Sequence, residues 1–241
     1  MIIALTLGYL SKKEFYYMAK RLCFISSADE FPLYKEIEVE FKYYNGFAIS
    51  QKQKSINSLH ESIKSIDNTL RVLEVSTKST SVLGVSLSAF NLKFLEVDSG
   101  KEYPLENIFQ SSKVFERGGP YRDLLDVHPG AAKRDERLKS SGKLIHFDHN
   151  GVIWDREPKT MFYDWIYMSS LYRNKNLSEN ILKYNAFTDI EFNHVNSINC
   201  QARAAAIFVS LKKNGMLESI LENQVEFRKT YLANEQISLF D

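Results

Sequence analysis

Apolar and polar positions alternate along residues 36–49, the first strongly patterned segment of the chain. This alternation, with the turn-forming pair Asn45-Gly46, predicts a β-hairpin. The next segment, residues 54–67, has helical spacing and predicts an amphipathic helix with the apolar positions Ile56, Leu59, Ile63 and Ile66. A strand is predicted at residues 71–76, so we expect residues 18–90 to form an N-terminal, β-rich α+β lobe.

The pattern changes after residue 91. Short polar turns separate strand-like segments at residues 92–105 and 143–155, which predicts two more small hairpins. Helical periodicity then dominates the segments 104–117, 158–174, 200–214 and 216–231. The sequence therefore predicts one α+β protein, in which a helical domain of residues 91–235 packs against the N-terminal lobe as one unit.

Residues 1–17 stand apart from this pattern. Met18 begins a segment that would make a natural start of translation, so we expect residues 1–17 to be a disordered or mis-started extension. Their apolar stretch is too short to cross a bilayer and lacks the features of a secretory signal. Cys23 and Cys200 lie far apart, outside any Cys-x-x-Cys spacing. These features favour a cytoplasmic protein without a membrane partner.

Charge limits the classes of nucleic-acid protein that the chain can represent. It contains 31 Lys and Arg against 30 Asp and Glu, a formal net charge of +1. Proteins that coat or scan DNA usually carry a large basic excess, so we exclude that class. Residues 131–143 nevertheless hold five basic against two acidic side chains, a net charge of +3. One basic segment of this kind is compatible with a protein that binds a single modified nucleotide.

Candidate chemistry is concentrated in the predicted helix 104–117. Glu106, Gln110 and Lys113 fall on one helical face, and Phe109 lies beside them. A carboxylate, an amide and an amine on a rigid element suit a polar functional site. From spacing alone, a solvated face with one Glu/Lys pair is the alternative.

Several segments resemble a known superfamily in the order of its motifs. They are SAFNL (88–92), PLENIFQSSKVF (104–115), AAKRD (131–135), a Trp-led helical stretch, and AFTDIEFN…NCQAR (186–203). This set resembles the NADAR (NAD and ADP-ribose-associated, YbiA-like) superfamily. GFAISQKQKSINSLHESIK, SSKVFERGGPYRDL and PKTMFYDWIY are more similar to the branch encoded beside DarT-type ADP-ribosyltransferase toxins. The resemblance spans roughly residues 18–230, which makes it more specific than any single motif.

This resemblance implies a YbiA-like helical core and an antitoxin enzyme, a hydrolase of the N-glycosidase type. The toxin of such a pair attaches ADP-ribose from NAD to guanine in DNA, and the NADAR protein removes it. The implied partners are ADP-ribosylated DNA, single-stranded or opened so that the base is accessible, and the cognate DarT-type toxin. No cofactor is implied.

The resemblance also assigns catalytic positions. Glu106 matches the catalytic glutamate of the superfamily, and Lys113 matches the basic position that closes its E-x-x-x-Q-x-x-K pattern. Asp189 matches a later acidic position, although Thr-Asp-Ile-Glu stands here where distant relatives have a Trp-Gly-Asp type of sequence, so Glu191 is its alternative. A carboxylate can stabilise an oxocarbenium-like transition state, and a lysine can hold the sugar as a Schiff base. Direct attack by water and the Schiff-base route both remain open.

Other positions are expected to bind the substrate. They are Ser88, Phe90, Asn91, Phe109, Gln110, Arg134, Trp154, Asn199, Gln201 and Arg203. Arg134 would hold the diphosphate, and Gln201 and Arg203 would meet a phosphate at a helix N-terminus. A turn at a strand end is the alternative for Ser88, Phe90 and Asn91. A solvated basic face is the alternative for Arg134, a core position for Trp154, and a helix cap for Asn199.

Two other functions stay open at this stage. One is an N-glycosidase that acts on a free nucleotide-like metabolite, and the other is a non-catalytic antitoxin that binds the toxin. The histidines offer no third ligand near the His146/His149 pair, so we expect no metal site.

Overall fold

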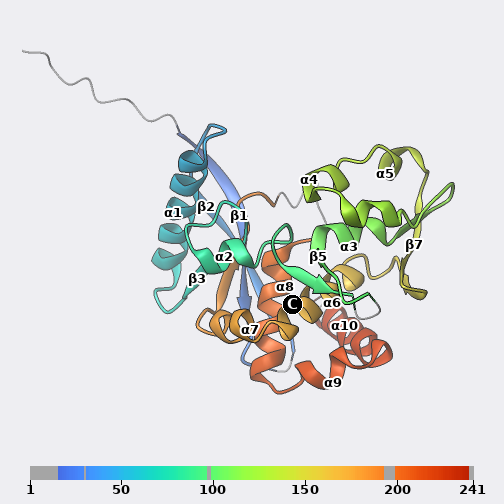
Figure 1. Cartoon of the computed structure of the whole chain (residues 1–241). Coiled ribbons are helices and arrows are strands. Elements are labelled where there is room, and N and C mark those ends of the chain that lie inside the picture. The colour runs from blue at the N-terminus through green and yellow to red at the C-terminus, as the bar shows by residue number, and fades with distance from the viewer. Residues whose placement is uncertain (1–15, 30, 97–98, 193–198, 239–241) are drawn as a thin grey trace, which may run out of the picture.

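The computed structural model describes residues 16–29, 31–96, 99–192 and 199–238 (Figure 1). Its strands are β1 Tyr16–Ser26, β2 Tyr34–Tyr44, β3 Val72–Glu74, β4 Lys93–Leu95, β5 Glu102–Pro104, β6 Lys113–Phe115, β7 Leu144–His149, β8 Val152–Asp155 and β9 Ala186–Thr188. Its helices are α1 Ile49–Ile66, α2 Val82–Ser86, α3 Leu105–Ser111, the 3-10 helix η1 Arg122–Asp126, α4 Pro129–Ala132, α5 Arg137–Ser140, α6 Met161–Arg173, α7 Lys175–Ile181, α8 Gln201–Lys213, α9 Leu217–Leu221 and α10 Gln224–Ser238. The α+β class is confirmed.

A four-stranded sheet in the order β2-β1-β9-β3 holds the two parts of the chain together. Strand β9 pairs antiparallel with β1 and parallel with β3, so a strand from the second half of the sequence lies inside the N-terminal sheet. The lobe of residues 18–90 is therefore completed by residues 186–188. Of residues 1–17, only Tyr16 and Tyr17 are described, and they pair with Tyr44 and Tyr43 in β2.

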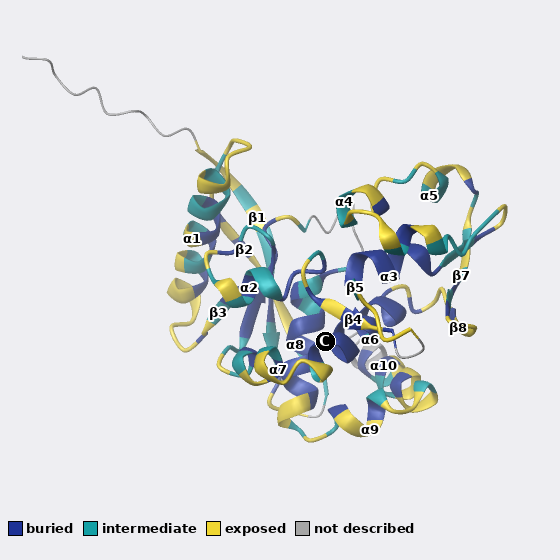
Figure 2. Ribbon diagram, in the orientation of Figure 1, coloured by how far each residue is buried: buried dark blue, intermediate teal, exposed yellow. Residues whose placement is uncertain are grey.

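Two hydrophobic clusters lie on either side of this sheet. The smaller one packs α1 onto β1 and β2 through Phe41, Ile56 and Leu59. The larger one surrounds α6 and α8, which are buried along most of their length (Figure 2). Helix α8 contains a run of alanines, whose small side chains let β1, β9 and α6 pack closely against it. The large cluster fixes the elements that carry the candidate site.

The structure corrects several predicted boundaries. Strand β2 pairs with β1, and Asn45-Gly46 leads into α1 instead of closing a hairpin within residues 36–49. The predicted helix 104–117 ends at Ser111, so Lys113 lies in β6. The predicted last helix is divided into α9 and α10. The hairpins β4–β5 and β7–β8 are confirmed, the second with Asn150 and Gly151 at positive φ in its turn.

Candidate active site

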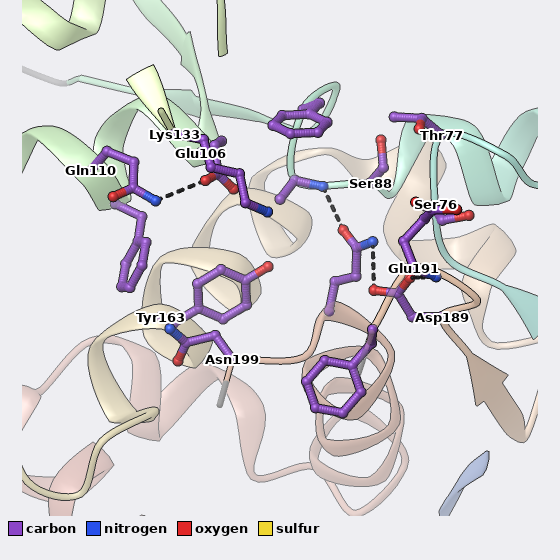
Figure 3. Close-up of a pocket in the computed structure, with 15 residues that line it drawn as sticks. Ser76, Thr77, Ser88, Glu106, Gln110, Lys133, Tyr163, Asp189, Glu191 and Asn199 are labelled. Atoms are coloured by element: carbon purple, nitrogen blue, oxygen red, sulfur yellow. Dashed lines mark hydrogen bonds between the residues drawn. The ribbon is translucent and has the colours of Figure 1, made fainter. Parts of the chain in front are cut away.

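A cavity of about 280 Å³ opens between α3, α4 and the ends of β3 and β9 (Figure 3). Eight predicted site residues line it: Ser88, Phe90, Glu106, Phe109, Gln110, Asp189, Asn199 and Gln201. The lining is completed by Ser76, Thr77, Ala89, Lys133, Tyr163, Glu191 and Phe192. The fold therefore gathers residues separated by more than a hundred positions around one space.

Helix α3 supplies the first wall. Glu106 lies in its first turn, where the exposed helix amides and the macrodipole favour a negative charge. The Gln110 amide, one turn later, donates a hydrogen bond of 2.8 Å to Glu106 Oε1. Lys113 Nζ in turn donates to Gln110 Oε1 at 2.7 Å. The predicted triad is thus a hydrogen-bonded chain, although its lysine comes from a strand.

Lys113 is placed by the turn that follows β6. Gly119 has φ +88°, and a side-chain carbon there would come within 2.3 Å of the Lys113 carbonyl oxygen, so glycine is required for this close approach. The ammonium lies 4.5 Å from the centre of the Phe109 ring. Burial, assisted by the positive charge of Lys133, lowers the pKa of Lys113 to about 8. Part of this lysine is therefore neutral near physiological pH.

Asp189 lies on the opposite wall, directly after β9 (Figure 3). Gln201, the first residue of α8, donates to Asp189 Oδ2 at 2.9 Å and accepts from the Ala89 amide at 2.8 Å. The Ala89 carbonyl accepts from the Glu106 amide at 3.0 Å. Gln201 thereby connects the Asp189 wall to the Glu106 wall. Its place at a helix N-terminus had predicted a phosphate-binding role instead.

Burial, and then the nearby charge of Glu74, raise the pKa of Asp189 to about 7. Glu74 itself is 1% exposed and accepts hydrogen bonds from the residues on both sides of Asp189. It accepts from the Thr188 hydroxyl at 2.6 Å and from the Ile190 amide at 2.8 Å. The presence of a glutamate inside the apolar strand segment 71–76 is a sequence signal for a buried carboxylate that positions Asp189, and it was not used in the prediction.

His60 extends the Glu74 network from helix α1. Its Nε2 lies 3.0 Å from the Thr188 hydroxyl. Burial lowers the pKa of His60 to about 4. In the unfolded chain His60 therefore becomes protonated below about pH 6.5, whereas in the folded chain it becomes protonated only near pH 4.

This difference predicts acid sensitivity. We expect His60 to lower the free energy of unfolding by about 3 kcal/mol as the pH falls from 7 to 4. Urea unfolding of the wild type and of His60→Gln at both pH values measures the effect, since other titrating groups are common to both proteins. Equal pH dependence in the two proteins would contradict the assignment.

Aromatic residues and one lysine complete the cavity. Tyr163 comes from α6 and meets the Phe109 ring edge-on, with 5.3 Å between ring centres. Lys133, labelled in Figure 3, lies over Phe90, with 5.5 Å between its Nζ and the ring centre. Neither was predicted: nothing in the apolar helical segment sets Tyr163 apart, and the neighbouring Arg134 was preferred to Lys133.

Five predicted site residues lie outside the cavity lining: the catalytic candidate Lys113, which reaches Glu106 only through Gln110, and four expected binding residues. The Asn91 amide donates to Val85 O and Ser88 Oγ, which makes it part of a turn. Lys133 lines the cavity in place of Arg134.

The other two are internal. Trp154 is 1% exposed and packs in the core against Trp165, with ring centres 4.7 Å apart. Arg203 forms a 2.8 Å ion pair with the fully buried Asp164, because that carboxylate needs a cationic partner in an apolar environment. Neither side chain is directed to a ligand.

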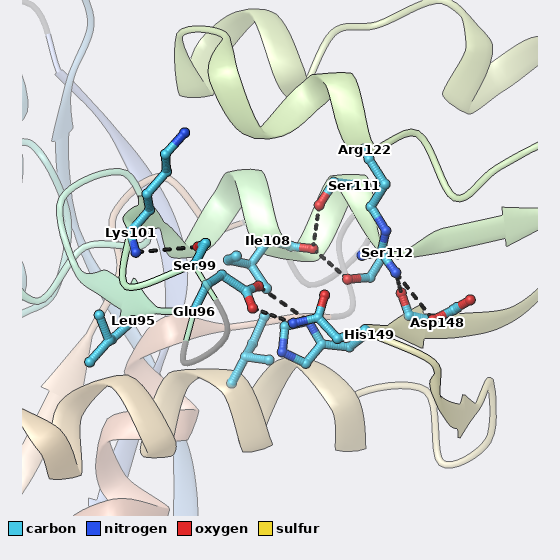
Figure 4. A network of polar contacts seen from close by, with 12 residues as sticks. Leu95, Glu96, Ser99, Lys101, Ile108, Ser111, Ser112, Arg122, Asp148 and His149 are labelled. Atoms are coloured by element: carbon cyan, nitrogen blue, oxygen red, sulfur yellow. Dashed lines mark hydrogen bonds and ion pairs between the residues drawn. The ribbon is translucent and has the colours of Figure 1, made fainter.

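A separate polar network fixes the far end of α3 (Figure 4). The Ser112 carbonyl, just after α3, accepts from the Asp148 amide at 2.7 Å, and Arg122 forms a 3.1 Å ion pair with Asp148. Glu96, from the end of the β4 strand, approaches His149 at 3.7 Å. These contacts tie α3 to both small hairpins, so the helix that carries Glu106 is held rigidly.

Among the described residues, no group of three or more His, Cys, Asp or Glu side chains is arranged to bind a metal ion. None of the helices in the same ranges is long and apolar enough to cross a membrane.

Comparison with known proteins agrees with the geometry. No curated protein matches the chain. A family model described as DarT1-associated NADAR antitoxin matches residues 19–238, which covers the sheet and every element of the cavity. The match assigns the chain an antitoxin role in a DarT system and implies a DarT toxin as its partner. The chain therefore belongs to the DarT1-associated NADAR antitoxin family.

Proposed function

We propose that this antitoxin is a hydrolase that removes ADP-ribose from guanine bases in DNA by cleaving the N-glycosidic bond at the anomeric carbon. The observation that carries the proposal is the placement of Glu106 and Asp189 on opposite walls of one cavity, which Lys133 and the aromatic rings of Phe90, Phe109 and Tyr163 also line. Cleavage of a glycosidic bond commonly uses two carboxyl groups on either side of the scissile bond.

Glu106 has the role of stabilising the sugar cation. As the bond between the anomeric carbon and the guanine nitrogen breaks, positive charge develops on the ribose ring. The Glu106 carboxylate, held by the Gln110 amide, is oriented before the reaction and needs no reorganisation to meet this charge. It can also accept the proton of the attacking water, whose oxygen bonds to the anomeric carbon.

Asp189 has the role of the acid. The departing guanine leaves with the electron pair of the broken bond and needs a proton on its nitrogen. With a pKa of about 7, Asp189 is partly protonated at neutral pH and can supply that proton. This role favours Asp189 over Glu191, whose carboxylate forms a 3.1 Å ion pair with Lys52 at the cavity rim.

Lys113 supports a second route to the same products. When the sugar ring opens, its anomeric carbon forms an imine with the guanine nitrogen. The neutral amine of Lys113 would add to this carbon, and the guanine amine would leave with the proton that the lysine loses. Water would then hydrolyse the Schiff base between lysine and sugar. The lowered pKa of Lys113 favours this chemistry. Lys133, which lines the cavity, is suited to the diphosphate as a point charge.

The direct test uses an oligonucleotide that carries ADP-ribosylated guanine. We expect the wild-type protein to release ADP-ribose and restore the unmodified oligonucleotide, both measured by mass spectrometry. Cleavage of an ADP-ribosylated nucleoside with no cleavage of the oligonucleotide would support the metabolite enzyme instead. An intact adduct together with a stable toxin complex would support an antitoxin that acts by binding alone.

A further inference from the structure

Aromatic and basic side chains gather at the open end of the β1–β2 hairpin, beside helix α1. Tyr16 and Tyr17 are 49% and 54% exposed, although tyrosines in strands are usually covered. Lys42 Nζ lies 5.0 Å from the centre of the Tyr16 ring, and Lys54 Nζ lies 5.9 Å from that of Tyr44. We call Tyr16, Tyr17, Lys42, Tyr44 and Lys54 the hairpin-end surface. In the β1–β2 register Tyr16 pairs with Tyr44 and Tyr17 pairs with Tyr43, so Tyr17 lies on the other face of the strand pair and the surface wraps around the end of the hairpin.

A groove of about 470 Å³ runs along this surface, between the hairpin and α1. Its lining includes Lys42, Tyr44 and Lys54 from the hairpin-end surface, and the polar side chains Asn57, Ser58 and Glu61 from α1. The two lysines of this lining outweigh its one acidic residue, Glu61. The groove thus joins a stacking face, hydrogen-bonding groups and a small positive charge in a protein whose overall charge is nearly zero.

The Tyr17 side of the hairpin-end surface leads to the rim of the cavity. Lys52 Nζ lies 3.1 Å from the carboxylate of Glu191, a cavity residue, and donates to the Tyr43 hydroxyl at 2.6 Å. The Tyr43 ring lies 5.2 Å from that of Tyr17. Arg21, four residues beyond Tyr17 on β1, donates to the Ile190 carbonyl. At about 3.3 Å per strand residue, Tyr17 is on the order of 13 Å from this point of the rim.

We propose that the hairpin-end surface binds the single-stranded DNA that flanks the modified guanine. Proteins that bind single strands without sequence preference combine lysines that follow the phosphates with aromatic rings on which bases stack. The four side chains Tyr16, Tyr44, Lys42 and Lys54 form two such pairs. This inference rests on the proposed function, because it supplies the strand on which the substrate base is carried.

The test measures binding and catalysis separately. Fluorescence anisotropy with an unmodified single-stranded oligonucleotide reports binding, and release of ADP-ribose from the modified oligonucleotide and from an ADP-ribosylated nucleoside reports catalysis. For Tyr17→Ala and Tyr44→Ala we expect DNA binding to weaken about fivefold or more each. KM for the oligonucleotide should rise in parallel, whereas KM for the nucleoside should not change.

Matched variants distinguish stacking from a loss of folding. Tyr17→Phe keeps the ring and should bind DNA as the wild type does. Lys42→Ala should weaken binding and lower the salt dependence of the affinity by roughly 0.7 in slope, whereas Lys183→Ala, near the end of α7, should change neither.

Two results overturn the inference. One is wild-type DNA affinity in the tyrosine and Lys42 variants, with the protein still active on the oligonucleotide. The other is loss of toxin binding alone, which would make this a protein-binding surface. Failure of the proposed function looks different, since the wild type would then release no ADP-ribose from any substrate.

Discussion

Replacement of Glu106 by glutamine should lower the rate of ADP-ribose release about a thousandfold, the range expected when an essential acid–base group is lost. Glutamine has the same shape and can still accept the hydrogen bond from Gln110, so the cavity should remain intact. What disappears is the negative charge that faces the developing sugar cation. Single-turnover assays with excess Glu106→Gln protein measure the chemical step free of product release.

Glu102→Gln is the matched control. Glu102 lies shortly before Glu106 in the sequence, in strand β5, and its side chain is exposed. Loss of its charge should therefore leave the rate within about twofold of wild type. Binding of ADP-ribosylated oligonucleotide by Glu106→Gln should persist. Full activity in Glu106→Gln would remove the catalytic assignment of the whole cavity.

Replacement of Lys113 by alanine should have the second largest effect. If the Schiff-base route operates, borohydride should trap a covalent sugar adduct on the wild-type protein and none on Lys113→Ala, with a rate about a hundredfold lower in the variant. The route needs the neutral amine. Activity should therefore rise with pH toward about 8, the pKa of Lys113, as the ammonium loses its proton.

Lys133→Ala provides the comparison, because Lys133 is the lysine that lines the cavity directly. We expect it to raise KM and to leave the trapped adduct in place. An adduct lost in Lys133→Ala and kept in Lys113→Ala would transfer the nucleophile to Lys133. No adduct on the wild type, with a rate that falls above pH 7 as Asp189 loses its proton, would leave attack by water as the route.

The sequence predicted best what depends on local pattern. The β4–β5 and β7–β8 hairpins and three of the four apolar positions predicted for α1 follow from alternation, turn residues and helical spacing. The fourth, Ile66, is 62% exposed at the end of the helix, where the sheet no longer covers it. Helix α3 was predicted too long, because Lys113 continues the helical spacing of Glu106 and Gln110. The β6–β7 pairing ends the helix, and long-range pairing of this kind leaves no signal in a short window.

The cavity could be predicted only in part, for a similar reason. Glu106 and Asp189, which the family resemblance singled out one by one, both line it, and their catalytic roles stay predictions. The resemblance did not reveal that Glu74 accepts hydrogen bonds from both neighbours of Asp189, or that Arg203 forms an ion pair with Asp164. Those roles follow from which buried charges meet in space, and the partners are separated by 39 to 116 positions.

The position of β9 between β1 and β3 has a consequence for how the antitoxin is made. Both of its neighbours are synthesised more than a hundred residues before it, and until it arrives each presents an unpaired edge. A chain that stops before residue 186 therefore leaves one edge of β1 and one edge of β3 without a strand partner, and it lacks the side of the cavity that carries Asp189. Unlike a protein assembled from independent modules, this antitoxin gains its cavity in a single late step of translation, so an incomplete chain offers no partial protection.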